Sequence, residues 1–260
     1  MGTAQMQGEL WGARPRDWSD LQEVAFRALY EAAFDAAKVG KGTNLLDVGC
    51  GAGLACQVAH ERGAKVSGLD ATASLLEIAR GRCPDADIRE GEMEELPFGD
   101  RSFDVVTGFN SFQYAADPAH ALVEARRVTT PTGCVVAAVW GAAERCELAP
   151  YLAALGKLMP PPPPGAPGPF ALSAPGALEA LVEKAGLRPE GGANAPVEMR
   201  FADEATALRG LLAPGPATRA INHSGEDAVR RGITGAIASY RKGDGSYVMR
   251  NEFRYLLSRP

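Results

Sequence analysis

A glycine-rich turn between two apolar segments constrains the fold of this chain more than any other feature. Residues 44–48 predict a short strand buried on both faces, and residues 54–62 predict a helix. Gly49, Gly51 and Gly53 fall between the two segments. Glycine allows the backbone to turn sharply and to approach a ligand closely. The pattern therefore predicts a strand–turn–helix unit with a ligand at its turn.

Strands and helices alternate through the rest of the chain. We expect further strands at 65–69, 87–89, 102–107, 133–140, 195–201 and 247–257. We expect helices at 20–38, 73–80, 118–128, 175–185, 205–212 and 226–240. Short crossovers of this kind produce parallel strands with helices on both faces of the sheet. The predicted fold is a doubly wound α/β fold with a mostly parallel, seven-stranded sheet.

The predicted organisation has three parts. Residues 1–40 form an N-terminal helical cap, residues 41–141 form a cofactor-binding core, and residues 142–260 complete the sheet. The last part also contains a proline run at 160–164, followed by Pro167 and Pro169. Such a run favours a stiff connector, although a partner-binding motif is an alternative. We expect the last part to supply a proline-rich loop and a helical substrate lid.

Composition limits the classes of partner. The net charge of −5 argues against nucleic acid, because neutralising phosphates requires a basic face. The five cysteines form no Cys-x-x-Cys pair and the three histidines are widely separated, so we predict reduced thiols and no metal. No signal sequence or membrane-spanning run is recognisable, so a cytoplasmic protein without a membrane partner is expected. A monomer and a homodimer are both compatible with the sequence.

An acidic residue at the end of the second predicted strand restricts the class of ligand that the turn could bind. Asp70 lies at the spacing expected for a carboxylate that binds two ribose hydroxyls, which predicts an adenosine-type ligand. A dinucleotide fold would require glycine at Leu54, but the third glycine is Gly53. The motif Gly-x-Gly-x-Gly preceded by Asp47 resembles the first motif of the class I S-adenosylmethionine methyltransferases. S-adenosylmethionine, with S-adenosylhomocysteine as its product, is therefore favoured over a dinucleotide.

The resemblance continues downstream over about residues 41–140. Residues 91–98, Gly-Glu-Met-Glu-Glu-Leu-Pro-Phe, look like the family's turn after strand three. This resemblance implies that Glu92 accepts a hydrogen bond from the adenine amino group and that Met93 packs on the ring, although the usual acid is Asp. Residues 103–106, 109–114 and 131–133 are similar to the family's fourth strand, its following loop and its turn into strand five. The resemblance implies a Rossmann-like methyltransferase fold and leans toward small-molecule enzymes of secondary metabolism.

These patterns define a set of candidate cofactor-binding residues. They are Asp47, Gly49, Gly51, Gly53, Asp70, Ala71, Glu92, Met93, Asn110, Phe112, Trp11 and Arg14. The segment from Trp11 to Trp18 is expected to fold over the cofactor, with Arg14 or Arg16 meeting the methionine carboxylate; simple hydrophobic anchoring is the alternative. Trp11, Trp18, Phe112, Tyr114 and Trp140 are candidates for an aromatic wall beside the sulfonium.

The resemblance implies methyl transfer by in-line displacement to a small-molecule acceptor. The sulfonium is already activated, so alignment and desolvation are the expected contributions of the protein. A general base is needed only for a hydroxyl or a weakly acidic carbon, and His223, Tyr114 and Gln113 are the candidates. The sequence leaves open whether the methylated atom is oxygen, nitrogen or carbon. A dinucleotide-dependent oxidoreductase and an inactive methyltransferase-like binding protein are the alternatives.

Overall fold

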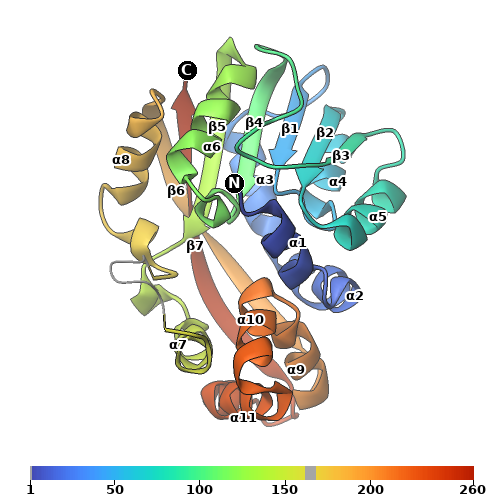
Figure 1. Cartoon of the computed structure of the whole chain (residues 1–260), viewed down its shortest axis with the longest axis vertical. Helices are drawn as coiled ribbons and strands as arrows, with labels where there is room; N and C mark the ends of the chain where they lie inside the picture. Colours follow the sequence, from blue (N-terminus) through green and yellow to red (C-terminus); the bar gives the residue numbers. More distant parts are fainter. Residues whose placement is uncertain (1, 162–167) are drawn as a thin grey trace.

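The computed structural model describes residues 2–161 and 168–260, and the predicted proline-rich connector lies partly outside them. Its centre is a seven-stranded sheet in the order β3-β2-β1-β4-β5-β7-β6 (Figure 1). The strands are β1 (Asn44–Val48), β2 (Lys65–Asp70), β3 (Asp87–Glu90), β4 (Phe103–Phe109), β5 (Thr129–Trp140), β6 (Arg188–Phe201) and β7 (Tyr247–Arg259). Strands β1 to β5 pair in parallel, and β7 runs antiparallel to both β5 and β6. The expectation of a mostly parallel, seven-stranded sheet is therefore confirmed.

Helices cover both faces of this sheet. The central strand β1 is buried on both sides, because Leu45 faces one core cluster and Leu46 faces the other. The first cluster includes side chains of α3 (Arg27–Ala36), α4 (Leu54–Glu61) and α5 (Ala73–Arg82). The second includes those of α6 (Pro118–Val128) and α8 (Ala177–Lys184). The chain reverses direction across the sheet between β1 and β4, which is where such folds bind ligands.

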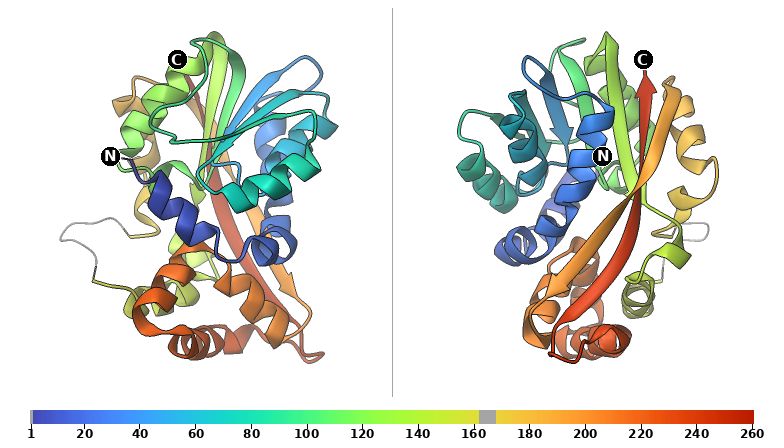
Figure 2. Two further views of the ribbon diagram at one scale, coloured as in Figure 1. Left: turned by 45° about the vertical axis from the view of Figure 1, so that its right-hand side comes forward. Right: turned by 180° about the vertical axis from the view of Figure 1, so that it is seen from behind.

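A second lobe of helices lies at one end of β6 and β7 (Figures 1 and 2). It contains α7 (Ala149–Leu158), α9 (Glu204–Leu212), α10 (Gly215–Ser224) and α11 (Glu226–Ile237). Strand β7 pairs with β5 only from Phe253 to Ser258, whereas its pairing with β6 extends to Tyr247. The free end of this hairpin therefore projects beyond the sheet and carries the helices. Helices α7 and α10 were not predicted from the sequence.

The N-terminal segment differs from the single helix expected at 20–38. Helix α3 is preceded by a π-helical turn (Trp18–Gln22) and a 3₁₀ turn (Glu23–Phe26). Two short helices, α1 (Ala4–Trp11) and α2 (Pro15–Asp17), come before them. The irregular turns bring the polar groups of Ser19 and Glu23 inward, where both residues are buried. A regular α-helix places residues three or four apart along one continuous face, so this polar pair would interrupt an apolar stripe.

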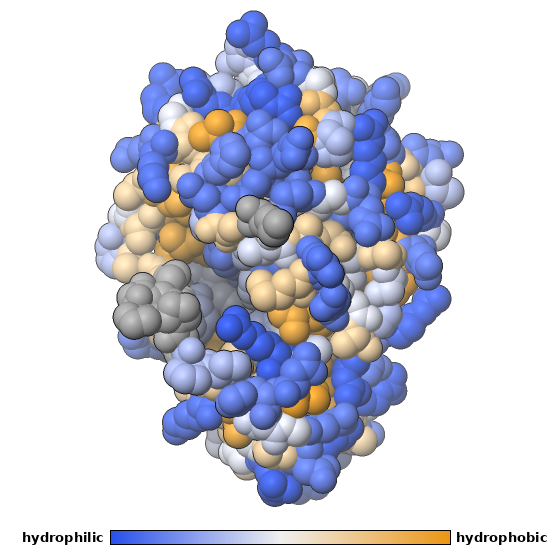
Figure 3. All heavy atoms as spheres, viewed as in Figure 1, coloured by the Kyte–Doolittle hydropathy of each residue, from blue (hydrophilic) through white to orange (hydrophobic). Residues whose placement is uncertain are grey.

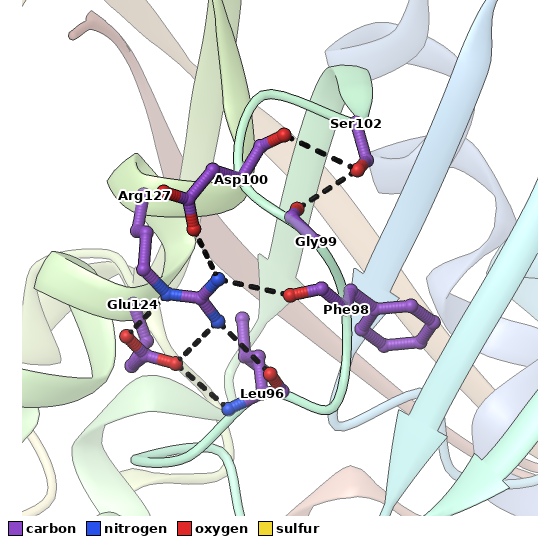
Figure 4. Close-up of polar contacts among 7 residues, drawn as sticks. All are labelled: Leu96, Phe98, Gly99, Asp100, Ser102, Glu124 and Arg127. Atoms are coloured by element: carbon purple, nitrogen blue, oxygen red, sulfur yellow. Dashed lines mark hydrogen bonds and ion pairs between the residues drawn. The ribbon is translucent and has the colours of Figure 1, made fainter.

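Arg127 holds the turn between β3 and β4 in place through several hydrogen bonds (Figure 4). The Arg127 guanidinium donates to the carbonyl oxygens of Leu96 and Phe98, each at 2.9 Å, and to Asp100 at 2.7 Å. Glu124 accepts from the Arg127 guanidinium and from the backbone N–H of Leu96. These contacts satisfy the backbone groups of a loop that would otherwise be free to move. They fix the segment that follows Glu92 and Met93.

Candidate cofactor site

The three glycines after β1 adopt backbone conformations that other residues rarely take. Their φ angles are +78° at Gly49, +54° at Gly51 and +84° at Gly53. A Cβ atom on Gly53 would lie 2.8 Å from the Cβ of Ala79 in α5. The backbone N–H of Gly49 donates to the Leu69 carbonyl at 2.7 Å, which ties the loop to β2. The loop is therefore a fixed turn packed closely on its neighbours.

Asp70, the last residue of β2, is joined directly to this loop. Its Oδ2 accepts a hydrogen bond from the Gly51 N–H at 2.8 Å, and its Oδ1 accepts from the Thr72 N–H at 2.9 Å. Burial raises the pKa of the Asp70 carboxyl, and these hydrogen bonds act in the opposite direction. The carboxylate thus stands beside the glycine loop at the carboxyl end of its strand.

A cavity opens at this end of the sheet. Its walls come from the N-terminal helices, the glycine loop and the segments after β2, β3 and β4. The lining residues are Thr3, Ala4, Gln7, Trp11, Trp18, Phe26, Leu29, Tyr30, Gly49, Gly51, Leu69, Asp70, Ala71, Thr72, Leu75, Gly91, Glu92, Met93, Phe109, Asn110, Ser111, Tyr114 and Phe253. The polar lining residues include Asp70 and Glu92, and the aromatic ones include Trp18, Tyr30 and Phe109.

Comparison with known proteins adds a family assignment to part of the chain. Residues 46–137 match the family described as "Methyltransferase domain". A demethylmenaquinone methyltransferase of Renibacterium salmoninarum is 36% identical over 104 residues, which are 40% of this chain and 44% of that protein. A ubiquinone biosynthesis O-methyltransferase of Alkalilimnicola ehrlichii is 35% identical over 101 residues, 37% of this chain and 41% of that protein. Residues 46–137 form a methyltransferase domain.

The assignment covers residues 46–137 only, and this chain spans less than half the length of either curated relative. The methyltransferase domain contains the glycine loop, Asp70, Glu92 and Asn110. Over the whole chain, the crystal structure of the [4+2]-cyclase SpnF is similar in fold. Its TM-score is 0.59 at 19% identity, and the match covers 99% of this chain and 92% of that one. The fold is therefore shared beyond the matched domain, over nearly the whole chain.

Most of the predicted cofactor residues of the methyltransferase domain lie on the cavity wall. Those on the wall are Gly49, Gly51, Asp70, Ala71, Glu92, Met93 and Asn110, together with Trp11 from the N-terminal segment. Asn110 is one of the few non-glycine residues with a positive φ, at +53°. Its Oδ1 accepts from Nε2 of Gln113 at 2.5 Å. Such backbone conformations concentrate at functional sites.

Three of the predicted residues are not among the described lining residues of the cavity. Asp47 is only 2% exposed, and its Oδ1 accepts from the Thr107 hydroxyl at 2.6 Å. Burial raises the pKa of Asp47 to about 7, even though the Thr107 hydrogen bond lowers it. Gly53 packs on α5, as described above. Phe112 is buried in the core cluster on the α6 face of the sheet, where a Cβ on Gly108 would meet its ring at 2.3 Å.

The basic candidate residues outside the methyltransferase domain are not among the described lining residues of the cavity. Arg14 forms an ion pair with Glu226 of α11 at 3.0 Å, and Arg16 is exposed. Neither residue lines the cavity in this structure. His223 is exposed on α10 and is also absent from the described wall, whereas Tyr114 lies on it. Of the three base candidates, Tyr114 alone is among the described lining residues.

Helix α1 covers the cavity beside Glu92 and Ala71. The N–H of Ala4 donates to Oε2 of Glu92 at 2.9 Å, and the Thr3 hydroxyl donates to the Tyr114 carbonyl at 2.7 Å. A Cβ on Gly8 would lie 2.5 Å from the Ala71 carbonyl oxygen, so the helix approaches the loop after β2 closely. The face that carries α1 is mostly hydrophilic, with hydrophobic side chains gathered near the helix (Figure 3).

The aromatic wall contains residues that sequence reasoning did not single out. Tyr30 packs against Phe109 with ring centroids 4.6 Å apart, and Phe26 packs edge-on against Phe253 at 5.2 Å. The predicted wall residue Trp140 stacks on Phe253 at 4.3 Å but lies in the core rather than on the cavity surface. Phe26 and Tyr30 are four positions apart, which is the spacing of one face of an amphipathic helix. The sequence pattern is the same whether that face packs in a core or lines a pocket, so it does not identify these residues as part of the cavity wall.

Proposed function

We propose that this chain is an S-adenosylmethionine-dependent methyltransferase that acts on a small molecule. The observation that carries the proposal is the hydrogen bond from the Gly51 N–H to Asp70 in the wall of a cavity rich in aromatic side chains, within a methyltransferase domain. A carboxylate at this place suits a pair of ribose hydroxyls. The turn glycines leave room above the backbone for the rest of the ligand.

The residues present fit this cofactor. Asp70 would hold the ribose, Glu92 and Met93 would meet the adenine, and the loop at Gly49 and Gly51 would lie under the amino-acid end. Leu54 stands where a dinucleotide-binding loop has its third glycine, which disfavours a pyrophosphate. Bound S-adenosylmethionine would supply an already activated methyl group.

The chain's own residues would align the reactants and exclude water. The aromatic side chains of Trp18, Tyr30 and Phe109 form an apolar wall, which would attract a sulfonium by about 1–2 kcal/mol when it is desolvated. Burial raises the pKa of Tyr114 to about 12, so this hydroxyl keeps its proton at neutral pH and can donate a hydrogen bond. Helices α10 and α11 would form the substrate lid, since α10 packs against α1.

Ligand binding and turnover test the proposal separately. Isothermal titration calorimetry should show binding of S-adenosylmethionine and no binding of NAD, and Asp70→Asn should weaken the cofactor at least about tenfold by losing charged hydrogen bonds. Asp87→Asn, which alters an exposed acid, is the control. Release of S-adenosylhomocysteine with a panel of phenols, amines and activated carbons identifies the acceptor. Binding of NAD in preference to S-adenosylmethionine would refute the proposal.

A further inference from the structure

One buried hydrogen-bond donor in the cavity wall has no partner. The indole Nε1 of Trp18 is shielded from solvent and makes no hydrogen bond to any described residue. Leaving a buried donor unpaired is unfavourable, so such groups usually meet a ligand or water. Trp18 lines the cavity, and a Cβ on Gly51 would lie 3.4 Å from its indole nitrogen. The unpaired donor therefore faces the glycine loop.

The cavity wall lacks a cation to receive an anionic group. Among the described lining residues there is no Lys, Arg or His. Arg14, which we predicted to meet the methionine carboxylate, is paired with Glu226 instead. A carboxylate entering this cavity would have to be bound by neutral donors. An indole N–H only donates, so it suits a carboxylate and cannot accept from an ammonium.

Gly51 fixes the direction in which such a carboxylate would lie. Its N–H points to Asp70 at 2.8 Å, while the position of its absent side chain faces Trp18. A nucleoside whose sugar is held by Asp70 would therefore extend its 5′ substituent across Gly51 toward the indole. Resting on the proposed function, we propose that the Trp18 indole N–H binds the carboxylate at the amino-acid end of S-adenosylmethionine.

The surrounding contacts hold Trp18 in place for this role. Trp18 begins the π-helical turn, a rare conformation that is often found at functional sites. Arg82 donates to the Ser19 carbonyl at 3.2 Å and to the Ala52 carbonyl at 3.0 Å, which joins this turn to the glycine loop. Glu23 also lies beside Gly51, but its ion pair with Arg82 balances its charge, so it does not repel an anion.

The test compares two ligands that differ only in the carboxylate. Calorimetry would measure the affinities of S-adenosylhomocysteine and of S-adenosyl-3-thiopropylamine, the same thioether without its carboxylate. Trp18→Phe should weaken S-adenosylhomocysteine about 10- to 100-fold and change the decarboxylated ligand less than about twofold, because only the former loses a charged hydrogen bond. Trp11→Phe removes a neighbouring indole, whose ring packs on Trp18 at 5.0 Å, and should affect both ligands equally.

The outcomes separate this inference from the proposed function. Equal losses for both ligands in Trp18→Phe would mean that the indole only packs, and unchanged affinities would also overturn the inference. Failure of the unaltered protein to bind S-adenosylhomocysteine would instead refute the proposed function. If Trp18→Phe does not fold, the ¹⁵N-labelled indole signal of Trp18 in the unaltered protein gives the answer. It should shift downfield with S-adenosylhomocysteine and not with the decarboxylated ligand; the same shift with both would overturn the inference.

Discussion

The buried carboxylate of Glu23 forms an ion pair with Arg82, and the same guanidinium donates to the Ala52 carbonyl at 3.0 Å. Glu23 belongs to the irregular turns before α3, whereas Ala52 belongs to the glycine loop. One side chain from the end of α5 therefore holds the N-terminal segment against the glycine loop. This link determines where Trp18 lies, because the π-helical turn begins at Trp18 and ends at Gln22, directly before Glu23.

Breaking this pair from one side should destabilise the fold. In Arg82→Met, Glu23 stays buried without a countercharge, and we expect a loss of about 3 kcal/mol in the free energy of unfolding. In the double variant Glu23→Met/Arg82→Met, both charges are absent, and most of that loss should be recovered. Urea unfolding of the unaltered protein, the Arg82→Met variant and the double variant measures the effect. Equal losses in the single and double variants would contradict the interpretation.

The glycine loop and α5 offer a matched pair of substitutions. Gly53→Ala places a Cβ in a left-handed conformation and 2.8 Å from Ala79, so we expect it to destabilise the protein by about 2–3 kcal/mol. Gly81 lies within α5, and a Cβ there would meet nothing within 4 Å. Gly81→Ala should therefore stabilise by about 0.5–1 kcal/mol through helix propensity. Thermal unfolding followed by circular dichroism distinguishes the two outcomes.

Asp47 should lower the free energy of unfolding as pH rises from about 4 to about 7, which is opposite to the effect of a carboxyl group with a lowered pKa. Burial raises its pKa from 3.8 to about 7 in the folded protein. The folded state therefore holds this proton more tightly than the unfolded state, and its contribution to stability is present below about pH 4 and lost as pH rises to about 7. The difference in unfolding free energy between the unaltered protein and Asp47→Asn should fall across this window, by at most about 1.4 kcal/mol per pH unit. A difference that stays flat or rises would contradict the raised pKa.

The sequence predicted the sheet well because the strands are buried on both faces. The first strand at 44–48 and the helix at 118–128 agree with β1 and α6 at both ends. Apolar segments bounded by glycine or proline leave few alternatives for such elements. Helix α10 was not predicted because Gly215-Pro216 is typical of a loop that interrupts a helix. Proline is nevertheless compatible with the first turn of a helix, which is where Pro216 lies.

The site was predictable only where local spacing carries the information. The glycines and Asp70 are related by their distance along the chain, so their proximity follows from one strand–turn–helix unit and the next strand. Trp18 and Arg82 are 64 positions apart, and only tertiary packing brings their segments together. For the same reason, Arg14 looked like a free cation in the sequence, whereas Glu226 of α11 pairs with it in the fold.

Two truncations should separate the roles of α1 and Trp18. Helix α1 has no fully buried residue, so deleting residues 2–12 should lower the free energy of unfolding by less than about 1 kcal/mol. It should still weaken S-adenosylhomocysteine about tenfold, because the helix covers the cavity beside Glu92 and excludes water there. Deleting residues 2–18 also removes the Trp18 indole, and affinity should fall by about a further tenfold or more. Equal affinities of the two truncated proteins would show that Trp18 contributes nothing once the helix is gone.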